Sequence, residues 1–368
     1  MSKHIGQLLF IGLEGTELKK HEADFIIKND IGGVTLFARN LKTPAELHKL
    51  CSDIYNLHTK LPSKAPLFIA IDMEGGRVHR LKAPFTQWPS LGKLAALDST
   101  AMAFKFANMM GAELRAVGIN LDFAPCIDVL SNPKNVLIGD RSLGSDPEYV
   151  AKIASALVRG YIKAGVLPCA KHFPGHGNTI IDSHLDLPIE EVDMKTLEGR
   201  ELIPFKKAFR ARMDLVMTAH IKFKNIDPTY PVTLSPIFIK KLLREDLRYR
   251  GLVITDDLDM KALANNYPKA EIPVLALQAG CDILLYCNDF TSPPIAIDAV
   301  NKAIAEKRVS STQVDESLAR VAALKKEVLA QAAPLPFAEA TKIIGHPEHL
   351  RVARAIQEGE VPQDLRAT

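Results

Sequence analysis

Residues 67–76 read LFIAIDMEGG: five apolar residues, then Asp72, and shortly afterwards a pair of glycines. A short continuous apolar run that ends in turn-forming residues is typical of a strand buried on both faces. An acidic residue placed directly after such a strand stands where parallel α/β folds gather their polar groups. The stretch therefore predicts a buried parallel strand with a candidate site at its carboxyl end.

Seven further runs of the same kind recur along the chain, at Leu8–Ile11, Gly33–Phe37, Ile119–Phe123, Gly165–Ala170, Leu215–Thr218, Leu252–Thr255 and Ile283–Tyr286. The segments between them carry helical patterns, as at Pro44–Leu57, Thr100–Val117, Glu148–Ala164 and Pro204–Arg212. Strands that alternate with helices indicate parallel βαβ units. Eight of them predict an α/β fold with a single (β/α)8 TIM-type barrel domain.

A doubly wound open sheet is the structural alternative, and periodicity alone does not exclude it. The first run is followed by Gly12-Leu13-Glu14-Gly15, which is no dinucleotide-binding fingerprint. We assign residues 1–332 to the barrel. The break Ala333-Pro334-Leu335-Pro336 starts a C-terminal tail, residues 333–368, which we expect to be partly helical and to pack on the barrel or fray.

The bulk composition is that of a soluble globular protein: 368 residues, 47% hydrophobic, 24% charged, with a net charge of +3. So small a net charge gives no general attraction to nucleic acid or membrane, and neither partner is expected. The start of the chain lacks a signal-peptide core, and no window approaches a membrane span. Cys126, Cys169 and Cys281 adjoin apolar runs, as buried thiols in a reducing compartment do. We expect a cytoplasmic protein.

Polar and ionisable residues collect where successive predicted strands end, at Asp72, Asp122, Asp128, Lys171, His172, His220, Asp256 and Asp257. Catalytic groups of barrel enzymes lie just past the carboxyl ends of the strands. Scattered surface charges would have no reason to follow this pattern. We therefore expect an active site at that rim.

Each of these residues also has an ordinary structural interpretation. Asp72 and the glycines after it suit a turn, and Asp257 suits the start of a helix. His220 alone is more often a core histidine than a catalytic group. Arg141, within Gly139-Asp140-Arg141-Ser142, suits a surface loop. These alternatives stay open at the level of single residues.

The segment from Lys171 to His184 is harder to explain as plain structure. It holds three histidines together with Pro174, Gly175 and Gly177, a composition that predicts a mobile, solvent-facing loop. Asp182 stands two residues before His184, so that in a turn the carboxylate can reach the ring and fix its tautomer. The segment thus predicts a titrating acid/base group on a flexible lid.

At this point the motifs match a known family. The chain resembles the family 3 glycoside hydrolases, and within them the bacterial β-N-acetylglucosaminidases of cell-wall recycling. The likeness spans roughly residues 5–330, and the ending Asp182-Ser183-His184 is characteristic of this branch. Four segments carry it, namely residues 71–78 (IDMEGGRV), 139–142 (GDRS), 171–177 (KHFPGHG) with 182–184 (DSH), and 255–260 (TDDLDM).

The resemblance implies a role for individual residues. Asp256 would be the nucleophile, and His184, paired with Asp182, the general acid and base. The residues that would hold the sugar are Asp72, Arg80, Arg141, Lys171 and His172. The activity implied is a retaining, exo-acting hydrolysis of terminal β-1,4-linked N-acetylglucosamine from peptidoglycan fragments (muropeptides). No cofactor and no metal are implied, and the partner is the small sugar substrate.

A histidine acid has a physical rationale in this mechanism. An imidazole titrates near pH ~6.5 without the burial that a glutamic acid needs, and Asp182 would favour the protonated ring. We also expect Arg141 and Lys171 to help keep Asp256 ionised by placing positive charge beside it.

Three competing hypotheses remain at this level. A metal-dependent barrel hydrolase could draw ligands from Lys171, His172, His176, His184, His220 and Asp256. Pro174 and Gly175 prevent His172 and His176 from sharing a helical face, and the first strand lacks a His-x-His pair, which weighs against it. The other two are a phosphorylase, in which phosphate replaces water, and a glycan-binding protein that has lost catalysis.

Overall fold

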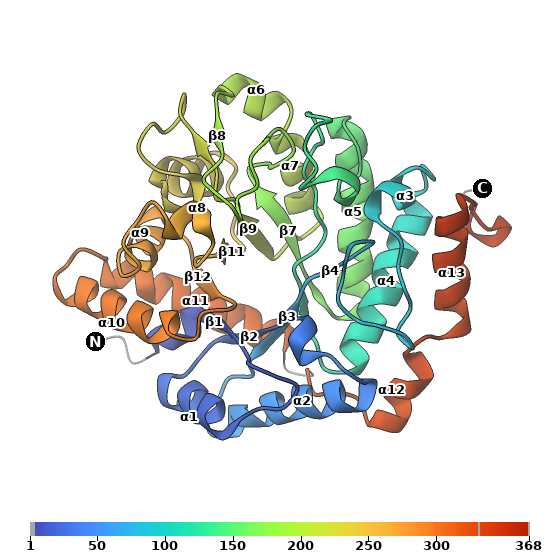
Figure 1. The fold of residues 1–368 in the computed structure, drawn as a ribbon, viewed down its shortest axis with the longest axis horizontal. Coiled ribbons are helices and arrows are strands. Elements are labelled where there is room, and N and C mark those ends of the chain that lie inside the picture. The colour runs from blue at the N-terminus through green and yellow to red at the C-terminus, as the bar shows by residue number, and fades with distance from the viewer. Residues whose placement is uncertain (1–3, 330–331, 367–368) are drawn as a thin grey trace.

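The computed structural model describes residues 4–329 and 332–366 and contains a closed barrel of parallel strands surrounded by helices (Figure 1). Around the barrel the strands follow the order β1-β12-β11-β9-β7-β6-β3-β2. Each predicted run supplies one of them, so the (β/α)8 barrel is confirmed and the doubly wound sheet is excluded. They are β1 (Leu9–Gly12), β2 (Gly33–Leu36), β3 (Phe68–Ile71), β6 (Leu121–Asp122), β7 (Leu167–Phe173), β9 (Leu215–Thr218), β11 (Leu252–Asp257) and β12 (Ile283–Tyr286).

The pairing register brings the carboxyl ends of the strands to one rim. In β9 and β11, Leu215 pairs with Leu252 and Thr218 with Thr255, so Asp256 comes directly after a paired residue. Most barrel-strand residues are fully buried, because the interior is packed on one face and the helices cover the other. Apolar residues on both faces explain why the strands read as continuous runs.

Helices connect successive strands and cover the barrel (Figure 1). Those before β9 are α1 (Lys20–Asn29), α2 (Pro44–Asn56), α3 (Leu91–Ala95), α4 (Thr100–Ala116), α5 (Pro147–Ala164), α6 (Met194–Gly199) and α7 (Leu202–Arg210). Later ones are a π-helical segment (Ile237–Asp246), α8 (Lys261–Ala264), α9 (Ile272–Ala279), α10 (Ser292–Ala305) and α11 (Ser311–Val328). Among the described residues, no helix combines the length and apolar character that crossing a membrane requires.

Local sequence signals set the ends of these helices, as α5 illustrates. The side chain of Asp146 accepts a hydrogen bond from the backbone N–H of Tyr149 at 2.7 Å, and Pro147 occupies the first turn. Gly165 ends the helix with a φ of 77°, a conformation that glycine adopts without strain. The chain then turns directly into β7.

The residues after 332 form two more helices, α12 (Phe337–Ile343) and α13 (Pro347–Glu358). Figure 1 shows α13 beside α4, on the outside of the barrel. Of the predicted ranges 1–332 and 333–368, residues 1–3, 330–331 and 367–368 lie outside the described residues.

The segment that begins at Lys171 differs from the prediction. Lys171, His172 and Phe173 belong to β7, and the chain stays buried through Gly177; exposure begins at Ile180. The prediction of a solvent-facing loop is therefore wrong for this first half. Its charged groups can be buried because each meets an opposite charge or a hydrogen-bond partner. The predicted burial of the three cysteines is confirmed.

Short irregular strands lie outside the barrel. An antiparallel hairpin of β4 (Met73–Gly75) and β5 (Val78–His79) follows β3, and β8 (Ile189–Glu190) pairs with β10 (Lys222–Phe223). The hairpin stands at the carboxyl rim and carries residues of the site described next.

Candidate active site at the carboxyl rim of the barrel

A cavity of about 950 Å³ opens at the carboxyl rim, and most of the predicted site residues line it. Its size is at the upper end of the range for small-ligand sites. The predicted residues on its wall are Asp72, Arg80, Arg141, Lys171, His172, His184 and Asp256. Asp182 stands behind His184. Residues from strands and loops that are far apart in the sequence thus meet in one cavity.

The floor of the cavity is a chain of alternating charges. Arg141 makes two hydrogen bonds of 2.8 Å to the carboxylate of Glu74, from Nε and from Nη2. The Lys171 Nζ atom lies 2.6 Å from an oxygen of Glu74 and 2.6 Å from Asp72 Oδ1. Glu74 is only 1% exposed, and the pairing in two directions balances its charge.

Burial and ion pairing shift the pKa values of these charged side chains in opposite directions, and ion pairing has the larger effect. Burial raises the pKa of Glu74, but Arg141 and Lys171 lower it more, so that the pKa lies far below its usual value. The pKa of Lys171 is raised by Asp72 and Glu74 in spite of burial. Glu74 and Lys171 are therefore both ionised at neutral pH, and each charge of the pair is balanced by its partner.

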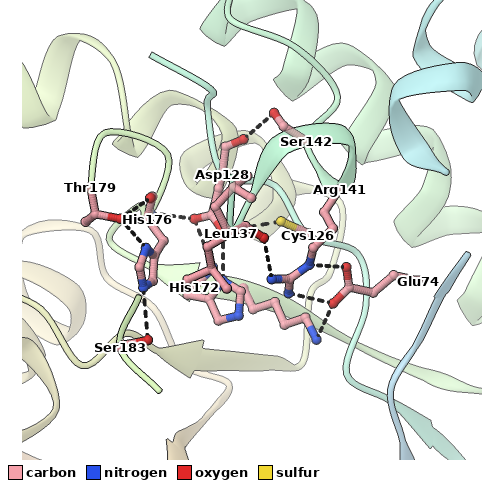
Figure 2. A network of polar contacts seen from close by, with 12 residues as sticks. Glu74, Cys126, Asp128, Leu137, Arg141, Ser142, His172, His176, Thr179 and Ser183 are labelled. Atoms are coloured by element: carbon pink, nitrogen blue, oxygen red, sulfur yellow. Dashed lines mark hydrogen bonds and ion pairs between the residues drawn. The ribbon is translucent and has the colours of Figure 1, made fainter. Parts of the chain in front are cut away.

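Asp128 organises the next layer, as Figure 2 shows from close by. One of its oxygens lies 2.7 Å from His172 Nδ1, and the other accepts the backbone N–H groups of His172 and His176. Cys126 also donates to it. Burial raises the pKa of Asp128, but the contact with His172 lowers it by more, so that the pKa is about 2. The ionised carboxylate accepts from Nδ1 of His172, which leaves Nε2 of that ring for a ligand.

His176 links this layer to the loop that follows. Its ring nitrogens contact Thr179 Oγ1 at 2.7 Å and Ser183 Oγ at 3.2 Å (Figure 2). Burial lowers the pKa of His176 to about 4, so the ring is neutral at pH 7. Its two nitrogens connect Thr179 and Ser183. Ser183, which contacts His176, is buried, whereas the next residue, His184, is exposed.

The Asp182–His184 contact expected from their spacing is present. One oxygen of Asp182 accepts from the backbone N–H of His184 at 2.8 Å and lies 2.8 Å from its Nδ1 atom. Nδ1 is therefore occupied, and Nε2 is the ring atom available to a ligand. On the other side, the carbonyl of Ser183 accepts from the N–H of Ala262, at the start of α8. This hydrogen bond attaches the loop to α8, which follows β11 in the chain.

Asp256 is the residue before the last of β11, and its environment keeps it ionised. Burial raises its pKa, but His220, His172 and the N–H of Asp257 together bring it below the usual value. His220 is fixed by contacts to Thr233 Oγ1 at 2.7 Å and the carbonyl of Asp257 at 3.0 Å. Arg141 and Lys171 were expected to place positive charge beside Asp256. They pair instead with Glu74, and Lys171 also pairs with Asp72.

The metal hypothesis has one geometric counterpart. Within residues 4–329 and 332–366, ligand-type atoms of Cys126, Asp128 and His172 lie within 4.8 Å of one another. In the structure these atoms bind each other: Asp128 Oδ2 contacts both Cys126 Sγ and His172 Nδ1. His176 and His220, which the hypothesis also invoked, bind protein groups through both ring nitrogens.

Several residues of the site were missed from the sequence. Glu74 and Asp128 stand in a motif and at a strand end without a predicted role, and His176 is predicted only as a metal ligand under the competing hypothesis. Lys261 and Asn288, which line the outer part of the cavity, had no signal at all. The signal that could have identified Glu74 as a site residue is its position two residues after Asp72, at the end of a barrel strand.

Known proteins resemble this chain in sequence over most of its length. A model of the glycosyl hydrolase family 3 N-terminal domain matches residues 1–324. A β-hexosaminidase from Alkalilimnicola ehrlichii is 40% identical over 298 residues, which cover 79% of this chain and 82% of the relative.

Two solved structures extend the comparison. A family 3 β-N-acetylglucosaminidase from Paenibacillus sp. str. FPU-7 superposes with a TM-score of 0.91 at 37% identity, over 98% of this chain and 68% of that one. NagZ from Neisseria gonorrhoeae, solved with N-trifluoroacetyl-D-glucosamine, gives a TM-score of 0.76 at 28% identity, over 96% of this chain and 98% of its own.

Proposed function

The chain belongs to glycosyl hydrolase family 3, and from this premise we propose that it is a retaining, exo-acting β-N-acetylglucosaminidase that acts on peptidoglycan fragments. It is a glycoside hydrolase. The observation that carries the finer proposal is that Asp256 and His184, from different parts of the chain, line one cavity. A retaining hydrolase needs a nucleophile and an acid on either side of one glycosidic bond.

In the first step Asp256 attacks the anomeric carbon while the glycosidic C–O bond breaks. The departing oxygen takes the proton from Nε2 of His184, because Nδ1 is held by Asp182. An ionised Asp256 is the state that attack requires, and its lowered pKa supports this role. The products of the step are the free aglycone and a sugar bonded to Asp256.

In the second step water attacks the same carbon and gives its proton to the now neutral His184. The bond to Asp256 breaks, and the sugar leaves with its original anomeric configuration. Two inversions at one carbon account for the retention. His184 thus returns to the protonated state in which it began.

The sugar itself would be held by the floor and its neighbours. Asp72 and Lys171 offer an acceptor and a donor, and His172 presents Nε2. Arg80 lines the cavity, and its buried Nε atom has no hydrogen-bond partner within the described residues. A buried donor without a partner costs about 1–3 kcal/mol, and a sugar hydroxyl that reaches the guanidinium of Arg80 would offset part of that cost. Arg141 orients Glu74 and so fixes Lys171.

The outer part of the cavity supports an acidic aglycone. The attachment of Ser183 to Ala262 puts the leaving-group side of His184 next to the start of α8. Lys261, the preceding residue, lines the same cavity, is exposed, and has no ion pair within the described chain. A lysine at that point suits the carboxylate that a muropeptide carries on its muramic unit. We accordingly propose cell-wall recycling in the cytoplasm, with residues 1–332 as the catalytic barrel and 333–368 as its tail.

The decisive experiment traps the covalent intermediate. A slow fluorinated N-acetylglucosaminide is added, and the labelled residue is located by mass spectrometry; we expect it on Asp256. Asp256→Ala should abolish release of p-nitrophenol from the β-N-acetylglucosaminide, whereas Asp315→Ala, an exposed aspartate on α11, should not. A label on another residue, or a fully active Asp256→Ala variant, contradicts the proposed nucleophile.

The remaining parts of the proposal have separate tests. Proton NMR of the first-formed sugar should show the β-anomer, and added phosphate should yield no sugar phosphate; an α-product or a phosphorylated sugar would refute retention or hydrolysis respectively. For the substrate, Lys261→Ala should raise KM for a muropeptide disaccharide but not for neutral chitobiose. Lys20→Ala is the matched control, since Lys20 is also exposed and begins helix α1. Equal effects on both substrates would argue against the acidic aglycone.

A further inference from the structure

The hairpin that carries Arg80 is a short excursion on the rim, so its position depends on what holds it. Met73 of β4 pairs with His79 of β5, and the backbone N–H of Arg80 donates to the sulfur of Met73 at 3.2 Å. These contacts fix Arg80 to the hairpin. The β4 side of the hairpin is fixed to the barrel, because the backbone N–H of Met73 donates to Asp122 of β6 at 2.9 Å and Glu74 pairs with Lys171 of β7.

His79 links the β5 side of the hairpin, next to Arg80, to the segment that follows it. Its Nε2 atom lies 3.0 Å from the carbonyl oxygen of Thr86, so Nε2 carries the proton and donates. Burial lowers the pKa of His79, which favours this neutral ring. Thr86 in turn gives both its backbone N–H and its hydroxyl to the carboxylate of Glu113, at 3.0 and 2.6 Å. The hairpin is thereby tied to helix α4.

The same carboxylate receives two donors from the C-terminal tail. His349 on α13 contacts Glu113 through Nδ1 at 2.8 Å, and the backbone N–H of Gly345 donates at 3.1 Å. Glu113 and His349 are 3% and 8% exposed, so the link is a buried one. Gly345 has a φ of 62°, and a Cβ there would lie 2.3 Å from the carbonyl oxygen of Pro84. The tail therefore packs closely against the segment between the hairpin and α3, which contains Pro84 and Thr86.

We infer that the tail is a positioning device for substrate binding, in which His349 acts on Arg80 through Glu113, Thr86 and His79. The inference rests on the sugar-binding role proposed for Arg80. The matched family model ends at residue 324, so the tail lies beyond it and nothing in that match accounts for it. His349 is a positioning residue and does not line the cavity.

The physical argument concerns the carboxylate of Glu113. It is buried and shared by donors from the excursion and from the tail, which jointly determine where it lies. Removing the tail's side-chain donor leaves the remaining donors to pull the carboxylate, and with it Thr86, into a new position. Arg80 would then meet the sugar poorly, while Asp256 and His184, on other elements, stay in place.

The test is a double-mutant cycle on KM and kcat for p-nitrophenyl β-N-acetylglucosaminide. We expect His349→Ala to raise KM about fivefold, the effect of roughly one hydrogen bond, with kcat within about twofold. His349→Asn keeps a donor at the Nδ1 position and should restore KM. In an Arg80→Ala background, His349→Ala should cause no further rise, because both changes remove the same interaction.

Arg351→Ala is the matched control on the same helix, since in the described part of the chain Arg351 pairs with Glu348 and Asp364, both in the tail. It should lower thermal stability somewhat without changing KM. Thr86→Val tests the link from the other side of Glu113 and should repeat the KM effect even if His349→Ala does not fold.

The outcomes separate the inference from the proposed function. If Arg80→Ala itself leaves KM unchanged, the role of Arg80 is wrong and the inference falls with it. If Arg80→Ala raises KM but His349→Ala and Thr86→Val do not, or if their effects add to that of Arg80→Ala, only the positioning role is overturned. A fall in kcat with unchanged KM in the folded variants would likewise reduce the tail to a purely structural part.

Discussion

Replacing Glu74 with glutamine is predicted to destabilise the protein strongly while changing almost nothing in shape. Glu74 is 1% exposed and balances Arg141 and Lys171 through contacts of 2.6–2.8 Å. Glutamine has nearly the same volume but no charge. Within the described residues Asp72 pairs with Lys171, so Lys171 would keep one carboxylate partner while Arg141 would lose its own.

The magnitude follows from the burial of the pair. Removing one member of a buried ion pair costs about 3–5 kcal/mol, because the partner is left buried without compensation. For a chain of 368 residues that corresponds to a fall in Tm of about 4–6 °C. Since Lys171 and Arg141 lose their fixed positions, kcat/KM should also fall, by about 10²-fold.

The pH dependence of this effect has a definite sign. The pKa of Glu74 is lower in the folded protein than in the unfolded chain. The stability it contributes is therefore fully present above its unfolded pKa of about 4.3 and is lost only as pH falls further. The difference between the variant and the parent protein should be constant from pH 6 to 8 and shrink only in acid.

Thermal unfolding followed by circular dichroism measures the effect, with kcat/KM measured on the same samples. Glu348→Gln is the control, because Glu348 pairs with Arg351 on the surface and such pairs contribute about 0–1 kcal/mol. If Glu74→Gln unfolded at the same temperature as Glu348→Gln and kept its activity, the reasoning about the floor of the cavity would be refuted.

Three further predictions concern titration, catalysis and metal. Burial and the nearby Glu327 raise the pKa of Asp214 to about 6, so this carboxyl destabilises the fold as pH rises from about 4 through 6. Asp214→Asn should raise the free energy of unfolding by about 1–2 kcal/mol at pH 8, discounted for its partial exposure, and leave it unchanged at pH 4; chemical denaturation at both pH values checks this, and an equal gain at both would contradict it. His184→Ala should lower kcat about 10²–10⁴-fold for an alkyl glycoside but much less for a dinitrophenyl glycoside, whose leaving group needs no proton; equal losses for both would remove its role as acid. Incubation with EDTA should leave kcat/KM unchanged, and a loss of activity restored by Zn²⁺ would revive the metal hypothesis.

The sequence alone was sufficient for the barrel and for part of the site. Parallel strands buried on both faces must be apolar along their whole length, and the eight runs could therefore be found one by one. Placing catalytic residues after such strands requires only the rule that the carboxyl ends share one rim. Asp182 and His184 are two residues apart, so their contact is a property of one turn, and it is present at 2.8 Å.

Burial of charge was not predictable in the same way. Lys171 in isolation suggests an exposed loop, and that expectation was wrong because its partners are Asp72, just after β3, and Glu74, in β4. Helix ends were predicted only to within a few residues, as in α7, where Leu202–Arg210 replaces Pro204–Arg212. Local pattern indicates that a helix is present, whereas packing decides where its last turn holds.

The sequence by itself determined the barrel, the rim on which the polar residues gather, and contacts between near neighbours in the chain. Tertiary structure decided which distant groups pair: Glu74 with Arg141 across 67 residues, Asp128 with His172 across 44, and Glu113 with His349 across 236. The reason is physical. Hydrophobic periodicity is written along the chain, whereas the partner that neutralises a buried charge is specified only when folding brings the two segments together.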